Sequence, residues 1–493
     1  MSWQKKIIIG STLVFLFFLI LGARIGYPYP LHADEWQHIG IARLKSAGEF
    51  GMAFGDQFHL EGGFHLVLNL IDKIVDLVMI YRFLPAIWTA LSGFLLFIII
   101  YRKTKDFLVS WLAIIFFASI KSNINLLGLW FFTPLSFAVP FIFLYLALID
   151  EGLEKHRPKL IMAGFLIASG LLTVHAVSVL FSLPVLAVLF WLHRSYWLKQ
   201  KSIWPFFLLL PIAGIWFYKY AKGLTWSAIG PALLSEIKFD YGWGVLELNN
   251  SLLEVYSLIG LILAVIGFWF ILKQKDYRRY ALYLAWPTIT LGAILFYRVF
   301  NSLSPNAFLL LAPYQRQMYY FALSLPFLSA IGLVKILKAI TQRTFIVNSD
   351  QVKITAVIIL ALPFMYMTFR NYYRPPNYPN LNPGFWELNK IIDDNDYHVL
   401  KFLKTKPKGV VMADLFFSTA LYPISGQYPL TTIAFVNQEA IEVIDNFYSA
   451  DDCDEKNKLI EKHNISYIVE RNKLIDNCDW DLIYNKGPYI YEK

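Results

Sequence analysis

Charged residues are scarce in this sequence, and their scarcity limits the class of protein. Only 16% of the residues are Asp, Glu, Lys or Arg, whereas 57% are hydrophobic and 17% are aromatic. The mean hydropathy of +0.50 lies outside the range of soluble globular proteins. The composition therefore excludes a soluble enzyme and predicts a membrane protein.

The sequence also lacks a cleavage site, internal repeats and a phosphate-binding loop, which further limits the class of protein. The first apolar run, 7–23, has no small-x-small cleavage site before Tyr27-Pro-Tyr-Pro30, which argues against a cleaved signal peptide. No internal repeat or low-complexity segment is visible. The C-terminal part also lacks a glycine-rich phosphate loop, so we expect it to bind or brace rather than to catalyse.

Apolar runs long enough to cross a bilayer, roughly 20 residues each, recur along most of the chain. About eleven spans are predicted: 7–23, 81–101, 107–121, 126–149, 160–174, 176–193, 203–220, 253–272, 280–299, 318–338 and 352–369. Basic residues gather in alternate loops, which predicts a cytoplasmic N-terminus and, with an odd number of spans, a C-terminus on the outer face. The net charge of +9 is then explained by loops facing an anionic leaflet, without a nucleic-acid partner.

The predicted architecture is a polytopic α-helical membrane protein with a small C-terminal extracytoplasmic α/β domain. Residues 1–370 form the membrane domain with a first outside loop at 24–80, residues 371–383 a proline-rich linker, and residues 384–493 the α/β domain. Its pattern predicts helices at 386–404, 418–425 and 454–463 and strands at 409–414 and 465–470. Cys453 and Cys478 both lie there, on the predicted oxidising side. A disulfide is expected, with two unpaired thiols as the alternative.

The first outside loop is predicted to be ordered. A short amphipathic helix is expected from Ala33 to Ala47, with Gly48 as its C-terminal stop. Asp34 and Glu35 would lie in its first turn, where the helix dipole favours negative charge. A second amphipathic stretch, 63–76, is predicted to lie on the outer leaflet rather than to span it.

This acidic pair is the leading candidate for chemistry. Four of the nine histidines, His32, His38, His59 and His65, share its loop. His38 follows Asp34 by four residues and so lies on the same helix face. The cluster could supply a general base with its hydrogen-bond partners, or Asp34, Glu35 and His38 could hold a divalent cation such as Mg or Mn. The alternative is that the acids only cap the helix.

Basic side chains near the predicted outer face form a second group of candidates. Arg316 and Arg298 stand at the outer ends of two spans, and Lys222 begins the second outside loop. They could bind a lipid-linked phosphate, whereas the alternative is snorkelling to lipid headgroups. His175, between two spans at the same face, is a further candidate neighbour or a purely structural histidine.

The architecture and three short motifs resemble the GT-C-type glycosyltransferases, which include protein O-mannosyltransferases, aminoarabinose transferases and oligosaccharyltransferases. The motifs are His32-Ala-Asp-Glu-Trp-Gln-His-Ile-Gly-Ile-Ala-Arg43, Gly62-Gly-Phe-His65 and Pro313-Tyr-Gln-Arg-Gln-Met-Tyr-Tyr320. The tail contains no Trp-Trp-Asp signature, which argues against asparagine-linked transfer. It also lacks any motif that identifies an acceptor.

The resemblance implies transfer of a sugar, with inversion, from a polyprenyl-phosphate carrier to a hydroxyl of a glycan, lipid or protein acceptor. Asp34 would be the general base, Glu35 and His38 its support, and Arg316 the group that neutralises the departing phosphate. The expected location is a prokaryotic plasma membrane. Two alternatives are a flippase or transporter of lipid-linked glycans and a structural glycan-assembly protein, although the rim charges and the lack of inverted repeats disfavour a transporter.

Overall fold

The computed structural model describes most of the chain. The described residues are 2–49, 61–122, 128–232, 238–239, 251–274, 277–303, 308–309, 314–344, 350–370, 372–373, 390–432, 437–471, 478 and 480–493. They divide into two compact units, each of which is described by itself. The helical unit comprises Met1–Ala23, His59–Phe64 and Pro85–Asn377, and the mixed unit comprises Arg24–Phe58, His65–Leu84 and Tyr378–Lys493.

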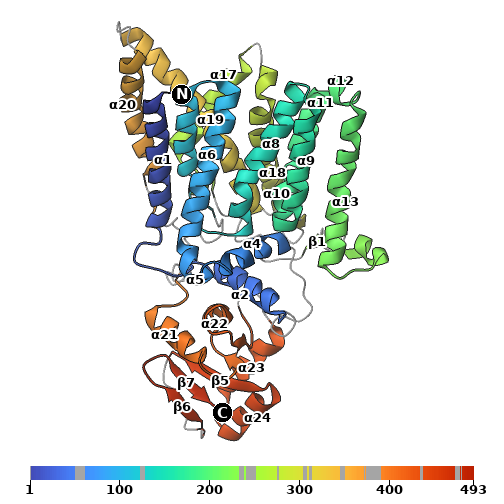
Figure 1. Ribbon diagram of the computed structural model, residues 1–493, viewed down its shortest axis with the longest axis vertical. Helices are drawn as coiled ribbons and strands as arrows, with labels where there is room; N and C mark the ends of the chain where they lie inside the picture. The colour runs from blue at the N-terminus through green and yellow to red at the C-terminus, as the bar shows by residue number, and fades with distance from the viewer. Residues whose placement is uncertain are drawn as a thin grey trace. The chain divides into compact units, whose positions relative to one another are not determined.

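Helices dominate the described chain (Figure 1). The principal helices of the helical unit are α1 (Trp3–Gly22), α6 (Leu84–Thr104), α7 (Phe107–Ala118), α8 (Pro134–Glu154), α9 (Pro158–His175), α10 (Val177–Leu180), α11 (Leu183–Leu192), α13 (Trp204–Ala221), α17 (Leu258–Leu272), α18 (Ala281–Leu303), α19 (Tyr314–Thr344) and α20 (Asp350–Phe369). Short helices are α12 (Arg194–Trp197) and α16 (Leu252–Val255), and β1 (Lys238–Phe239) pairs antiparallel with β2 (Phe308–Leu309).

Seven stretches of the described residues are long and apolar enough to cross a membrane. They are Trp3–Gly22, Leu77–Thr104, Pro134–Glu154, Pro158–His175, Lys201–Tyr220, Tyr277–Val299 and Arg316–Thr341. Each overlaps a span predicted from the sequence. The other four predicted spans coincide with the shorter apolar helices Phe107–Ala118, Val177–Leu192, Leu258–Leu272 and Ile358–Phe369. These long apolar helices are those of an integral membrane protein. The predicted count of about eleven spans is not confirmed.

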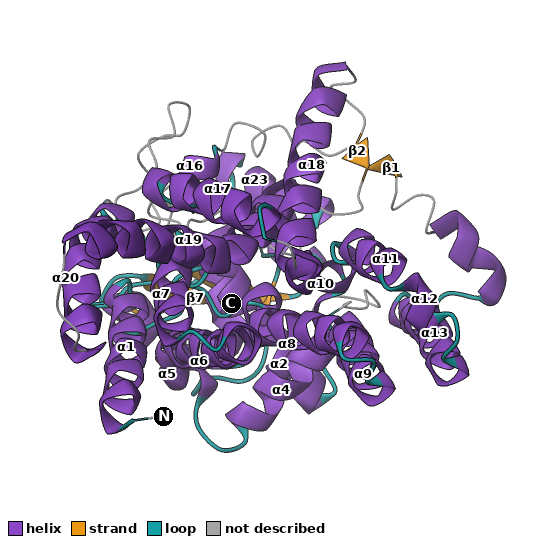
Figure 2. Cartoon of the chain, turned by 90° about the horizontal axis from the view of Figure 1, so that it is seen from above, coloured by secondary structure: helices purple, strands orange, loops and turns teal. Residues whose placement is uncertain are grey.

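Helix α19 is the central helix of the helical unit and packs against α7, α17 and α18 (Figure 2). Its contact with α17 is a close approach of two backbones. A Cβ added at Gly267 would collide with the backbone carbonyl of Leu328, and one at Gly332 would collide with that of Leu263. Small residues that let helices approach closely are typical of membrane helix packing, where burial of apolar surface gives little driving force between helices.

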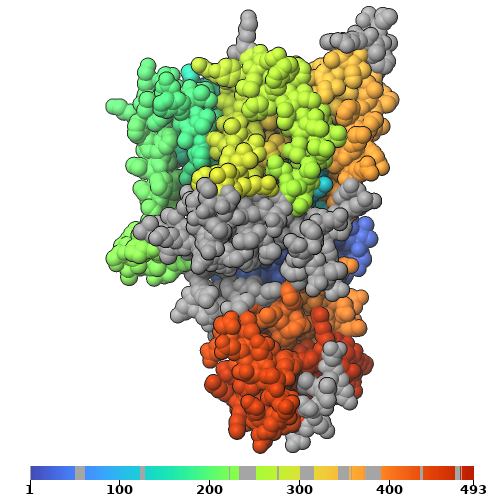
Figure 3. All heavy atoms as spheres, turned by 180° about the vertical axis from the view of Figure 1, so that it is seen from behind, coloured from blue at the N-terminus to red at the C-terminus, as the bar shows by residue number. Residues whose placement is uncertain are grey.

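The outward face of α17 carries large apolar side chains. Leu258, Ile262, Val265 and Trp269 are 47–69% exposed, and this part of the surface is yellow-green in Figure 3. Exposed apolar side chains in such number on one helix would be unfavourable in water, but they suit contact with lipid tails.

The mixed unit contains a five-stranded sheet of order β4-β3-β5-β7-β6. Its strands are β3 (Val410–Met412), β4 (Tyr428–Pro429), β5 (Ile465–Glu470), β6 (Asp481–Tyr484) and β7 (Tyr489–Glu492). The first three are parallel neighbours, whereas β7 runs antiparallel to both β5 and β6. Helices α23 (Gln438–Ser449) and α24 (Cys453–Lys462) supply Val443, Phe447 and Ile460 to the core, against Met412 and Ile468 of the sheet.

The remaining helices of this unit come from the loop and from the start of the tail. They are α2 (Ala33–Ala47), α4 (Gly62–Asp72), whose first residues belong to the helical unit, α5 (Leu77–Ile80), α21 (Asp394–Leu403) and α22 (Leu415–Ser425). Helix α2 packs against α22, and α21 packs against α22. The first loop and the tail therefore form one compact unit, although the chain separates them by about 300 residues.

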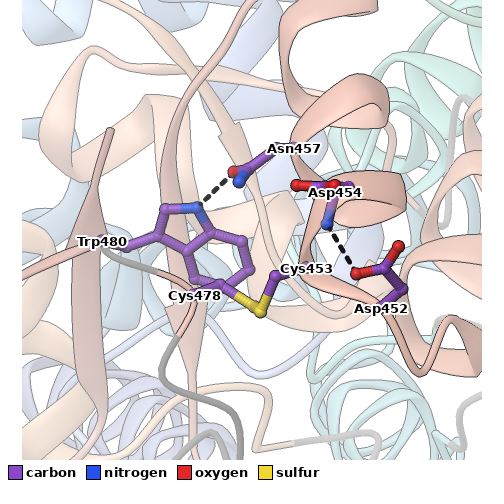
Figure 4. Close-up of a disulfide and its surroundings, with 6 residues drawn as sticks. All are labelled: Asp452, Cys453, Asp454, Asn457, Cys478 and Trp480. Atoms are coloured by element: carbon purple, nitrogen blue, oxygen red, sulfur yellow. Dashed lines mark hydrogen bonds between the residues drawn. A yellow bond between two sulfur atoms is a disulfide. The ribbon is translucent and has the colours of Figure 1, made fainter.

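Most elements expected in the tail are present. The strand at 465–470 coincides with β5, and the helix expected at 418–425 is α22, which ends at Gly426 in the left-handed conformation, φ +76°. Of the helix expected at 386–404, residues 394–403 form α21, residues 390–393 are not helical, and residues 386–389 lie outside the described chain. Cys453 and Cys478 are joined by a disulfide beside Trp480 (Figure 4), which ties the start of α24 to the segment before β6.

Candidate functional site

The first turn of α2 has a capping arrangement that fixes both acids of the Asp-Glu pair. His32 is the N-cap residue, and its Nδ1 accepts a hydrogen bond of 3.1 Å from the backbone N–H of Asp34. Glu35 completes the capping box, because its Oε2 accepts from the backbone N–H of Leu31 at 2.7 Å and of His32 at 3.4 Å. The backbone N–H groups at the start of a helix have no partner inside the helix, and these capping bonds satisfy them.

Glu35 is a buried anchor. Its side chain is fully buried, and its Oε1 lies 2.5 Å from the NH2 group of Arg24, whose side chain is also fully buried. Removing either partner of such a pair would leave a charge in a poorly solvated interior. The carboxylate therefore fixes the segment from Arg24 to Leu31 against the start of α2.

Asp34 differs from its neighbour in exposure. Its side chain is 37% exposed, and its Oδ1 lies 3.7 Å from Nδ1 of His32, too far for a hydrogen bond. A partly exposed carboxylate on a rigidly capped helix can reach a ligand, whereas a buried, ion-paired one cannot. The two acids of the pair thus have separate environments, and Asp34 is the one suited to accept a proton from a substrate hydroxyl.

A histidine pair lies between α2 and α4. Nδ1 of His38 is 3.1 Å from Nε2 of His65, and both side chains are buried. Two imidazole nitrogens at this distance must share a proton or a cation, because two lone pairs facing each other repel. Of the other loop histidines, His32 is the N-cap residue and His59 lies outside the described residues.

Arg43 of α2 has several partners in the structure, although no role was predicted for it from the sequence. Its guanidinium binds both carboxylate oxygens of Asp72, at 2.9 and 2.6 Å, and Oδ1 of Asp76 at 3.0 Å. It also donates to the backbone carbonyl of Pro423 in α22. One side chain therefore joins four segments of the mixed unit. The sequence signals this role of Arg43 only weakly, by an arginine on an amphipathic helix that is followed by two acids in the next helical stretch.

In the helical unit the structure brings together two of the predicted residues, His175 and Arg316. His175 ends α9, and its Nδ1 lies 2.7 Å from Oγ of Ser178, which is 3.2 Å from the hydroxyl of Tyr320. Arg316 begins the described side chains of α19, and its charge acts on His175 and on Tyr320. Ser178 was not predicted from the sequence, and Tyr320 was named only as the last residue of the motif 313–320, without a role, since a serine or a tyrosine in an apolar helix carries no distinctive pattern.

Lys222 and Arg298 have exposed side chains. Lys222 is the C-cap residue of α13, and Arg298 lies near the end of α18. Exposure at helix ends is what snorkelling to headgroups predicts, and it is equally compatible with contact to a lipid phosphate.

The fold and these sites define an integral membrane protein in which a capped loop helix presents one acid. The chain is similar to solved membrane glycosyltransferases. The oligosaccharyltransferase of Archaeoglobus fulgidus tethered to an acceptor peptide matches with a TM-score of 0.57 and 13% identity over 96% of this chain and 70% of that one. The oligosaccharyltransferase AglB from Archaeoglobus fulgidus in complex with an inhibitory peptide and a dolichol-phosphate matches with a TM-score of 0.53 and 11% identity over 95% of this chain and 70% of that one.

ArnT of Cupriavidus metallidurans matches with a TM-score of 0.55 and 11% identity over 98% of this chain and 97% of that one. Another structure of the Archaeoglobus protein is a complex with Zn and sulfate. No protein-family model matches the chain, and no curated protein matches it in sequence. These neighbours are members of the GT-C superfamily, so the expected GT-C fold is confirmed.

Proposed function

We propose that the protein is a membrane glycosyltransferase that moves a sugar from a polyprenyl-phosphate carrier to a hydroxyl acceptor, with inversion at the anomeric carbon. One observation carries the proposal: Asp34 is partly exposed on a helix start that the buried Arg24–Glu35 pair holds in place. The GT-C fold supports the class of reaction. The acceptor would be a glycan, a lipid or a protein hydroxyl.

In the proposed reaction the acceptor oxygen attacks the anomeric carbon while its proton passes to the Asp34 carboxylate. The bond from the anomeric carbon to the phosphate oxygen breaks, and the electron pair leaves with the lipid phosphate. A general base contributes roughly 10²–10⁴ in rate. Glu35 would act by positioning, since its carboxylate is committed to Arg24 and to two backbone N–H groups.

Arg316 is the proposed donor-phosphate residue. A guanidinium near the first turn of a long helix can neutralise the charge that develops on the leaving phosphate. The relay from His175 through Ser178 to Tyr320 would fix the packing of α19 near Arg316. Lys222 and Arg298 are the further proposed contacts to lipid-linked phosphate.

The proposal also includes a divalent cation, with ligands and an identity that differ from those considered from the sequence. The 3.1 Å between the nitrogens of His38 and His65 fits two ligands of one tetrahedral ion, for which Zn–N distances are about 2.0–2.1 Å. Imidazole nitrogens suit Zn far better than Mg, which prefers oxygen. The pair therefore favours Zn over the Mg or Mn considered from the sequence, and the bound ion would supply charge and rigidity beside α2.

We propose that the active face is extracytoplasmic, as the distribution of Lys and Arg predicts, and that the organism is prokaryotic. The second candidate function is a flippase for lipid-linked glycans. It would use the same phosphate-binding arginine but would not need Asp34.

The test is transfer of label from a radioactive polyprenyl-phosphate sugar in membranes that contain the protein. Asp34→Asn should lower the rate by roughly a hundredfold or more. The matched control is Asp445→Asn, which changes an exposed acid on α23 and should leave the rate unchanged. Full activity of Asp34→Asn would exclude the base assignment. Movement of labelled lipid across vesicles by a protein that transfers no sugar would instead favour the flippase.

A further inference from the structure

The mixed unit contains a pocket that the proposed reaction does not use. Its volume is about 250 Å³. It is formed by side chains from α2, the turn before α5, α21 and the C-terminal end of α22. The lining residues used below are Arg43, Asp76, Tyr397, Lys401, Lys404 and Tyr422. All of them belong to the mixed unit.

The pocket is separate from Asp34, although α2 contributes to both. Arg43 follows Asp34 by nine residues on one continuous helix. Nine residues correspond to about 13.5 Å of rise and two and a half turns. The two side chains therefore leave the helix in opposite directions. A ligand in the pocket would not be the sugar that reacts at Asp34.

The back wall of the pocket is rigid. Arg43 uses its guanidinium to bind Asp72, Asp76 and the carbonyl of Pro423. The hydroxyl of Tyr422 donates to Glu49 at 2.9 Å, which holds its ring in place. Side chains fixed before the ligand arrives reduce the entropy cost of binding.

The rim of the pocket carries both signs of charge. Lys401 and Lys404 stand three residues apart on α21, hence on one helix face, and both are exposed. Neither forms an ion pair with a residue in the described part of the chain. Asp76 is 47% exposed at the same pocket; burial raises its pKa, but Arg43, the backbone N–H of Val78 and the charge of Lys401 together lower the pKa below its ordinary value. Asp76 is therefore an ionised acceptor at neutral pH.

The two lysines and the ionised Asp76 together favour some anionic ligands over others. A simple anion such as phosphate would gain from the lysines but, being mainly an acceptor, would supply little to Asp76, whose charge Arg43 already offsets. A sugar with a carboxylate satisfies both, because its carboxylate can meet the lysines while a ring hydroxyl donates to Asp76. The half-buried ring of Tyr397 lies beside them, with the ring of Tyr29 5.0 Å away and Nζ of Lys401 5.4 Å from its centroid. A sugar ring would therefore contact the part of the Tyr397 ring that lines the pocket, next to the Lys401 ammonium. The volume is below the roughly 300–1,000 Å³ of sites for drug-sized ligands, which suits a single sugar unit.

We propose that this pocket binds one carboxylated monosaccharide unit, a hexuronate, of a glycan that the enzyme handles. The identity of that glycan as donor or acceptor rests on the proposed function, but binding in the pocket does not require catalysis. The pocket would set specificity by recognising a unit other than the one transferred.

The experiment measures binding of methyl β-glucuronide and methyl β-glucoside to the purified full-length protein in detergent by ligand-observed NMR. The wild type should bind the glucuronide roughly fivefold more tightly, because two exposed charge contacts contribute about that much. The Lys401→Ala/Lys404→Ala variant should lose this preference. The control variant is Lys458→Ala/Lys462→Ala, which removes two exposed lysines from α24 and should keep it.

Three results would overturn the inference: equal binding of the two glycosides, retention of the preference in the Lys401/Lys404 variant, or displacement of the glucuronide by inorganic phosphate at equal concentration. Loss of binding of both glycosides in Tyr397→Leu would support the sugar-ring contact. A failure of the proposed function would give different results from a failure of the pocket inference. If the wild type transfers no sugar but binds the glucuronide with lysine dependence, the pocket inference stands alone.

Discussion

The buried ion pair between Arg24 and Glu35 makes a sharp prediction about the start of α2. Arg24→Met keeps the length of the side chain but removes the positive charge beside the buried Glu35 carboxylate, which still accepts from the backbone N–H groups of Leu31 and His32. Breaking a buried pair in this way typically costs about 3–5 kcal/mol. Since every 1.4 kcal/mol is a factor of ten, local opening at the start of α2 should become roughly a hundredfold or more easier.

Hydrogen exchange of the full-length protein in nanodiscs, read by mass spectrometry, measures this opening directly. The backbone amides around Asp34 to His38 should exchange faster in Arg24→Met, while those of α24 in the same unit should not change. Combining Arg24→Met with Glu35→Gln removes both charges but keeps an acceptor for Leu31 and His32. The double variant should therefore exchange more slowly than Arg24→Met alone.

Two outcomes would refute the reasoning. If Arg24→Met accelerated exchange by less than about fivefold, equivalent to about 1 kcal/mol, the pair would not anchor the helix. If the double variant were as disturbed as the sum of the single ones, the interaction between the two charges would be negligible.

Three further predictions concern other parts of the molecule. Gly267→Ala should lower thermal stability, by about 1–3 kcal/mol, because its Cβ meets a backbone carbonyl. Gly292→Ala has nothing within 4 Å of the added Cβ and gains helix propensity, so it should keep or raise the melting temperature in the same assay. Burial first and the charge of Asp414 second raise the pKa of Glu470 to about 7. A raised carboxyl pKa gives stability that is fully present below the unfolded pKa of about 4.3 and is lost as pH rises to the folded pKa of about 7, so Glu470→Gln should flatten the decline in melting temperature between about pH 4.5 and 7, and an unchanged profile would contradict it. Cys478→Ser opens a link across a sequence separation of 25 and should destabilise the mixed unit by about 2–5 kcal/mol, measured as faster proteolysis of the tail.

Local signals explain why parts of the fold could be predicted. The bounds of α2 agree with those expected because the two acids of its first turn and Gly48 after its last turn are recognisable start and stop signals, whereas the N-cap role of His32 was not predicted. The strand β5 was recognisable from its run of apolar and aromatic residues. By contrast α23, β4, β6 and β7 were missed. Strands β6 and β7 are short and of mixed composition, and they become strands only because β7 pairs with β5 and β6 pairs with β7.

The candidate site was predictable only in part, for a related reason. Asp34 could be proposed from its position after an apolar run, but the partners that separate it from Glu35 could not. Arg24 lies eleven residues before Glu35, and Pro423 lies 380 residues after Arg43. No local periodicity encodes pairings at such separations, which become visible only when the loop and the tail are seen to form one unit.

The environments of Asp34 and Glu35 have a consequence for how substitutions at the two positions are tolerated. Adjacent residues on a helix point about 100° apart, so one acid can face inward while the other faces out, and their order fixes which does which. In a swapped Glu-Asp sequence the shorter carboxylate would have to span the distance to Arg24 and to the N–H groups of Leu31 and His32. The two acids carry the same charge but are not interchangeable, and a distant homologue with the reversed order would need a different anchor for this loop.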